Sequence, residues 1–216
     1  MVNEIRQAFA QRGYRLLLRP FELNVFGIRS NISIPNVFDD SINVLFVDSA
    51  GKPQLYSWMA TTDPGTYWLK NPMHPQGTAI LKPGQYIGSH ALGMHRGEYM
   101  ALVQVKPLTV IRDFNRDDRV DYNTGRQMTG LFGINIHRAL EGGNTRYIDS
   151  HSAGCQVFAS ATDFDVFLRL AERHKKLYGN SFTYTLLHDL PGSSIPQFNA
   201  AGKVTNSDEM NAVKKN

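Results

Sequence analysis

Cys155 is the only cysteine of this 216-residue sequence, and it stands in the small and polar segment Ser-Ala-Gly-Cys-Gln, residues 152–156. His137 lies eighteen residues upstream, at the end of the strand-like segment 133–137. A thiol needs a base to remove its proton and free peptide N–H groups to hold an oxyanion. We therefore expect Cys155 to be a nucleophile and His137 its base, with the N–H groups of Gly154 and Cys155 as oxyanion donors.

The presence of a single cysteine limits the kinds of cysteine site that this chain can form. It excludes an internal disulfide and a zinc site made of several cysteines. A lone cysteine is most often a small buried hydrophobe, but here its neighbours Ser152, Gly154 and Gln156 are not the aliphatic residues of a packed strand. A papain-like order needs its histidine ~130–150 residues after the cysteine, whereas only 61 residues follow Cys155. A caspase-like order is disfavoured because the Gln-Ala-Cys signature is missing and His95 lies 60 residues upstream.

The spacing of these residues resembles the catalytic signature of the L,D-transpeptidase (YkuD-like) family of peptidoglycan enzymes. In that pattern a His is followed, after about fourteen to seventeen residues, by Ser or Thr, His, Gly and Cys. Fourteen residues separate His137 from Ser152, and Gly154 and Cys155 match the last two positions. Ala153 stands in place of the second His, and Val157 in place of an Arg or Asn.

The sequences of segments 61–68, 77–81 and 182–187 also resemble those of a divergent branch of that family. The branch is found in phage-encoded and bacterial cell-wall-acting proteins. The resemblance implies an L,D-transpeptidase-like β-sandwich and acyl transfer on peptidoglycan stem peptides through a Cys155 acyl-enzyme. It leaves the acceptor open, so that transpeptidase, carboxypeptidase and endopeptidase activities all fit. The alternative is a non-enzymatic β-rich module of a phage or injection particle that kept the fold.

Four further residues are candidate substrate-binding residues. Asn135 shares the polar face of the expected strand with His137, because side chains alternate along a strand. His151 lies next to the matched Ser152. His95, in an expected loop that also holds His90, and Tyr99 could line a substrate groove. We expect no cofactor and no catalytic metal.

Composition predicts one sizeable domain over residues 1–198, followed by a polar tail over 199–216. The chain has 42% hydrophobic and 19% charged residues, which is ordinary for a globular protein. Its net charge of +4 suits an anionic cell wall, and the basic residues do not form the stripe that nucleic-acid binding needs. No apolar run is long enough for a membrane span or a signal peptide. We therefore expect action at the bacterial cell wall or periplasm after delivery by phage lysis or a dedicated secretion route.

The elements that must position these residues are mainly β-strands with one long bracing helix, an α+β arrangement. Short β-rich segments bounded by Gly, Pro, Asn or Asp predict strands, at 21–29, 42–48, 55–61, 79–82, 99–105, 109–113, 131–137 and 182–187. A short helix is expected over 3–12. A long helix is expected to start at an N-cap on Thr162 and to end at Gly179, beneath the catalytic turn.

The acidic segment 113–121 is a second candidate. Oxygen-bearing residues at its positions one, three, five and nine, from Asp113 to Asp121, match the start of an EF-hand calcium loop. Asp118 replaces the turn glycine and Thr124 replaces the bidentate Glu. We therefore favour a salt-bridged surface turn over a calcium site.

Overall fold

The computed structural model describes residues 1–31, 34–123 and 125–188. The expected polar tail over 199–216 lies outside the described residues, as does Thr124. The described chain is mainly β-sheet with one long helix, which confirms the predicted class. Within these residues, no helix has the length and apolar character needed to cross a membrane.

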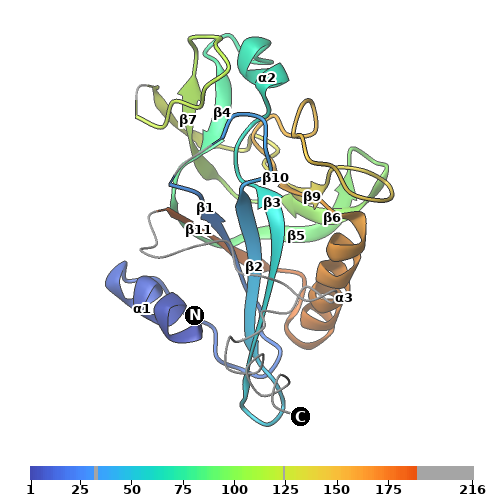
Figure 1. Ribbon diagram of the computed structural model, residues 1–216. Helices are drawn as coiled ribbons and strands as arrows, with labels where there is room; N and C mark the ends of the chain where they lie inside the picture. Colours follow the sequence, from blue (N-terminus) through green and yellow to red (C-terminus); the bar gives the residue numbers. More distant parts are fainter. Residues whose placement is uncertain (32–33, 124, 189–216) are drawn as a thin grey trace, which may run out of the picture.

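Eight strands close into a barrel in the order β1-β11-β5-β6-β9-β10-β3-β2 (Figure 1). Two neighbouring pairs, β1 with β11 and β9 with β10, are parallel, and the other pairs are antiparallel. The strands are β1 (Asn24–Arg29), β2 (Asp40–Val47), β3 (Pro53–Thr61), β5 (Gly84–His95), β6 (Tyr99–Gln104), β9 (Ile136–Arg138), β10 (Gln156–Phe158) and β11 (Phe182–His188). Closure leaves every barrel strand among the described residues with a neighbour on both sides, so the barrel itself has no edge strand.

A second, three-stranded sheet lies at one end of the barrel, at the top of Figure 1. Its strands are β4 (Thr78–Leu81), β7 (Leu108–Asp113) and β8 (Gln127–Gly130), all antiparallel. The short helix α2 (Thr66–Lys70) lies at the same end. This end of the molecule also holds the segments that surround Cys155.

Helix α3 (Ala161–Tyr178) braces the barrel with an aromatic face. Its Phe164 and Phe167 rings contact Phe158 of β10, with ring centroids 5.4 and 5.1 Å away, and Trp58 of β3 contacts Phe158 and Phe167. Burying side chains of this size contributes about 1.5–3 kcal/mol each. The helix therefore fixes β10, the strand that follows Cys155.

The start of α3 differs slightly from the sequence prediction. Ser160, rather than Thr162, is the N-cap, because its Oγ accepts the N–H of Asp163 at 3.2 Å. The helix ends at Gly179 as expected, with φ of 89°. The first helix, α1 (Val2–Gln11), covers another side of the barrel through Ile5 and Phe9.

Two segments near the site have a different secondary structure from the one predicted. The segment with His90 and His95, expected as a loop, is part of β5, the longest strand. Its glycines and histidines hide the alternation that identifies a strand. The expected strand over 131–137 is limited to Ile136–Arg138, because Gly133 adopts a φ of 71° and turns the chain.

Candidate active site around Cys155 and His137

The parallel pair β9–β10 brings the cysteine segment beside the histidine segment. Val157 is in register with His137, and Gln156 with Ile136. Ile136 belongs to the barrel core and Gln156 is fully buried, where Tyr184 donates to it at 2.7 Å. Since side chains alternate along a strand, Val157 and His137 point to the other face. Cys155 packs in the same small cluster as Val157, so the thiol lies on the face that carries His137.

The turn before β10 is held by its own hydroxyl. Ser152 is buried; its Oγ donates to the Cys155 carbonyl at 2.8 Å and accepts the N–H of Gly154 at 3.2 Å. Of the two expected oxyanion donors, the Gly154 N–H is thus engaged inside the turn. The Cys155 N–H has no hydrogen-bond partner among the described residues.

The packing of the cysteine turn requires a glycine at position 154. Its φ is 120°, and a Cβ there would lie 2.2 Å from the Ala79 carbonyl oxygen of β4. Side chains rarely adopt that φ, and the backbone of β4 leaves no room for one. Close packing of the turn on β4, rather than approach of a substrate, therefore requires this glycine.

Gly65 and helix α2 hold the turn before β10 through two hydrogen bonds. The Gly65 N–H donates to the Ser152 carbonyl at 2.9 Å, and Trp68 Nε1–H donates to the Ser150 carbonyl at 2.9 Å. A Cβ on Gly65 would lie 2.0 Å from the Asp149 carbonyl oxygen. The two segments therefore form one rigid unit around the cysteine.

The thiol of Cys155 is half-buried and contacts the backbone of the histidine segment. Sγ donates to the Gly133 carbonyl at 3.3 Å and accepts the Asn135 N–H at 3.5 Å. Between these described residues there is no hydrogen bond from Sγ to His137. Burial raises the pKa of the Cys155 thiol, while the Asn135 N–H and the positive charge of Arg96 act in the opposite direction.

His137 is buried, and its tautomer is fixed. Its Nδ1 lies 2.8 Å from the Arg138 carbonyl oxygen, which can only accept, so Nδ1 carries the hydrogen. The Tyr99 hydroxyl donates to the same carbonyl at 3.2 Å and lies 3.2 Å from Nδ1. Nε2 is then the basic nitrogen. Burial, and next the neighbouring His95, lower the pKa of His137 to about 3.

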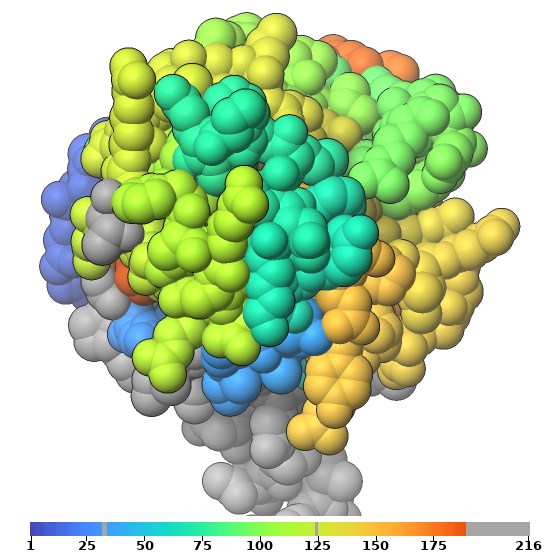
Figure 2. Space-filling model, turned by 90° about the horizontal axis from the view of Figure 1, so that it is seen from above, coloured from blue at the N-terminus to red at the C-terminus, as the bar shows by residue number. Residues whose placement is uncertain are grey.

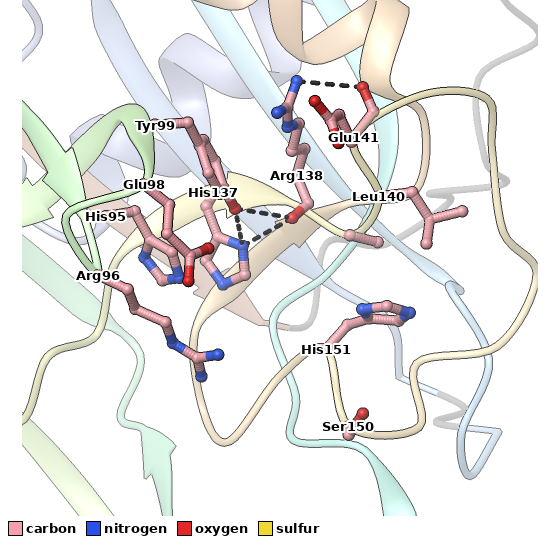
Figure 3. Close-up of a pocket in the computed structure, with 11 residues that line it drawn as sticks. His95, Arg96, Glu98, Tyr99, His137, Arg138, Leu140, Glu141, Ser150 and His151 are labelled. Carbon is pink, nitrogen blue, oxygen red and sulfur yellow. Dashed lines mark hydrogen bonds between the residues drawn. The ribbon is translucent and has the colours of Figure 1, made fainter.

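A polar pocket of about 360 Å³ opens beside this imidazole (Figure 3). Four predicted site residues line it. His95 and Tyr99 come from the β5–β6 hairpin, His137 comes from β9, and His151 comes from the segment before Cys155. Asn135 does not line it, and instead donates from Nδ2 to His95 Nδ1 at 3.0 Å. The structure thus brings four predicted residues together at one pocket, which Cys155 itself does not line, and gives Asn135 a supporting position.

The sequence analysis missed the other lining residues. They are Arg96, Glu98, Arg138, Ala139, Leu140, Glu141 and Ser150. In Figure 2 the β5–β6 hairpin (green) and the segment after β9 (yellow to orange) lie side by side at one edge of the molecule, where the pocket is formed. Gly97, shortly before the expected strand over 99–105, is a turn signal that could have drawn attention to Arg96.

The acidic segment 113–121 forms a surface turn apart from this pocket. Its side chains mainly bind its own amides; for example, Asn115 Nδ2 donates to Asp121 Oδ2 at 2.8 Å, and Asp118 forms an ion pair with Lys70 at 3.3 Å. Over the described ranges, no group of three or more His, Cys, Asp or Glu side chains is arranged to hold a metal ion.

Comparison with known proteins gave no significant match to a family model, a curated protein or a solved structure.

Proposed function

We propose that this protein is a cysteine acyltransferase or peptidase of the L,D-transpeptidase type, acting on peptidoglycan stem peptides. One observation carries the proposal: Cys155 lies on the same face of the β9–β10 pair as His137, whose Nδ1–H is fixed on the Arg138 carbonyl. That tautomer leaves Nε2 free to take a proton at the wall of a polar pocket. The substrate class comes from the resemblance of segment 137–155 to that family.

In the first step of the proposed mechanism, the Cys155 thiol exchanges its hydrogen-bond partner. Cys155 leaves the Gly133 carbonyl, transfers its proton to His137 Nε2, and attacks the carbonyl carbon of the meso-diaminopimelate residue. A tetrahedral oxyanion forms, and the Cys155 N–H is positioned to stabilise it, a contribution of about 2.7–4 kcal/mol for such a donor. The imidazolium then returns its proton to the leaving nitrogen, and the terminal D-amino acid departs.

The second half-reaction releases the acyl group. An amine or a water molecule gives its proton to His137 Nε2 and attacks the thioester carbon, and the thiol is restored. An amine acceptor gives a cross-link or an amino-acid exchange, and water gives hydrolysis. With peptidoglycan as the proposed substrate, either reaction would occur at the bacterial cell wall.

The electrostatics oppose a preformed thiolate–imidazolium pair. The pKa of His137 is about 3 and that of the thiol is raised, so both groups are neutral at pH 7. An imidazole with a pKa of about 3 is a weak base toward a thiol, so proton transfer to Nε2 requires that substrate binding raise the pKa of His137. The charge on the thiolate then develops only during the reaction.

A non-enzymatic binding module is the second candidate function. The bond from Sγ to the Gly133 carbonyl favours it, because a thiol held there is packed rather than activated. Val157, in place of an Arg or Asn, is fully buried beside the cysteine. Such a module would bind peptidoglycan without forming an acyl-enzyme.

Incubation with purified peptidoglycan, followed by mass analysis of the muropeptides, tests the two functions. The wild-type protein should release a terminal D-amino acid or form new cross-links, and a disaccharide-tetrapeptide should add its acyl mass to the protein. Cys155→Ala should do neither, and Cys155→Ser should be nearly inactive because a hydroxyl is harder to deprotonate. Binding to peptidoglycan without product or adduct would support the non-enzymatic module instead.

A further inference from the structure

We propose that Arg96 forms a carboxylate-binding subsite in the pocket and selects peptides that carry a free carboxylate next to the bond attacked by Cys155. The inference rests on the proposed function for the identity of the substrate. The subsite itself rests on the position, surroundings and charge of Arg96.

The β5–β6 hairpin holds Arg96 at its tip in an unusual conformation. Arg96 and Gly97 have φ values of 53° and 75°, and the turn is closed by the Glu98 N–H, which donates to the His95 carbonyl at 2.9 Å. The left-handed region costs a residue with a side chain roughly 1–2 kcal/mol. In Figure 3 the Arg96 side chain extends into the pocket, below the imidazole of His137 in this view.

The residues on either side fix this tip. His95 stacks on His137, with ring centroids 4.1 Å apart, and Tyr99 carries the guanidinium of Arg138 over its ring at 4.5 Å. His95 and Tyr99 both line the pocket beside the imidazole of His137. The hairpin tip is thus positioned relative to His137 and is not a free loop.

Arg96 brings a positive charge with unpaired donors to the pocket. Among the described residues, no hydrogen bond and no ion pair engages its guanidinium, although Glu98 lines the same pocket. Arg138, the other lining arginine, already donates to the Glu141 carbonyl at 3.2 Å. A guanidinium with free paired donors matches the two oxygens of a carboxylate.

The field of Arg96 reaches the reacting groups. Its positive charge lowers the pKa of the Cys155 thiol and that of the His137 imidazole. Because burial lowers the pKa of both His95 and His137, these imidazoles are neutral, and Arg96 is the unpaired cation that a substrate carboxylate would meet beside His137. A carboxylate bound there would lie close to the attacked carbonyl, which orients the peptide for reaction.

Alkylation of Cys155 tests the subsite without any peptide. Iodoacetate carries a carboxylate and iodoacetamide does not, so the ratio of their rates at one pH reports the local potential independently of the thiol pKa. Arg96→Gln should lower the iodoacetate-to-iodoacetamide ratio about tenfold, Arg96→Lys should lower it less, and salt should weaken the wild-type preference. Arg6→Gln, on exposed α1 and outside the pocket, is the matched control and should leave the ratio unchanged. An unchanged ratio in Arg96→Gln would overturn the subsite, with circular dichroism showing that the variant is folded.

Defined tetrapeptides then identify the carboxylate. One peptide has both carboxylates free, one has an amidated C-terminus, and one has an amidated diaminopimelate side chain. Arg96→Gln should lower kcat/KM about 10–100-fold for the free peptide, mainly through KM, and should have no effect on the peptide whose contacting carboxylate is amidated. Equal losses for all three peptides would overturn the carboxylate role. If no peptide reacts with wild-type protein while the alkylation ratio still depends on Arg96, the proposed function fails and the anion subsite stands.

Discussion

The imidazole rings of His95 and His137 stack with their centroids 4.1 Å apart and their planes 26° from parallel. The two residues come from different strands, β5 and β9, and each has one nitrogen engaged, by Asn135 and by the Arg138 carbonyl respectively. Stacked rings so close together oppose each other's protonation. Burial, and next the stacked His95, therefore keep His137 neutral.

The first prediction concerns His137 as the base. His137→Ala should lower the rate of acyl-enzyme formation by about 10²–10⁴-fold, the usual contribution of a positioned general base, with a much smaller change in substrate binding. The rate is measured by mass spectrometry of the protein during a single turnover. His74→Ala, in a loop outside the pocket, should keep the wild-type rate. A wild-type acylation rate in His137→Ala would remove His137 from the mechanism.

The second prediction concerns the pH dependence of the Cys155 thiol. An activated thiolate would react with iodoacetamide near pH 6, but burial raises the pKa of this thiol and His137 is neutral at that pH. The alkylation rate should therefore be low at pH 6 and should still be rising above the usual thiol pKa of about 8.5. The same protein in urea is the control, and should titrate at the usual value. A rate that is already constant from pH 6 upward would show a preformed thiolate.

The sequence predicted the parts of this site that depend on local pattern. The cysteine turn, the histidine eighteen residues upstream and the long helix ending at Gly179 all follow from residue types and spacing. The parts that depend on long-range pairing were not predictable in this way. The register of Val157 with His137 and the pairing of His95 with Tyr99 exist only once the barrel closes, and they decide which side chains face the pocket. The misread β5 segment is the reason that Arg96, at its tip, was missed.

The third prediction separates the structural role of Gly154 from a chemical one. Gly154→Ala should lower the free energy of unfolding by about 1–3 kcal/mol, because it combines a disfavoured φ with a collision against the Ala79 carbonyl. Gly142→Ala is the control, since a Cβ there meets nothing within 4 Å, and its effect should stay within about 0.5 kcal/mol. Both values come from urea unfolding at neutral pH. Equal stability of the two variants would mean that the turn does not pack on β4 as described.

The last prediction concerns acid stability and His90. This residue is fully buried, with Nε2 2.9 Å from the Ile134 carbonyl oxygen and Nδ1 2.9 Å from Ser89 Oγ, and burial lowers its pKa to about 4. In the unfolded chain a histidine has a pKa of about 6.5. Between pH 6.5 and 4 the unfolded state therefore binds a proton that the folded state does not, and stability falls as the pH falls.

The shift of His90 corresponds to a loss of about 3 kcal/mol over that window, and the low pKa of His137 adds a loss in the same direction. Urea unfolding of the wild-type protein at pH 7 and pH 4.5 should show this decrease. His90→Gln, which can still donate and accept, should be less stable at pH 7 but should lose less on acidification. If the variant does not fold, NMR titration of His90 in the wild-type protein gives the same answer, and a pKa near 6.5 would contradict the explanation. A buried, neutral His90 also links acid stability to the site, since it holds the carbonyl of Ile134, the residue between the two backbone groups that contact the Cys155 thiol.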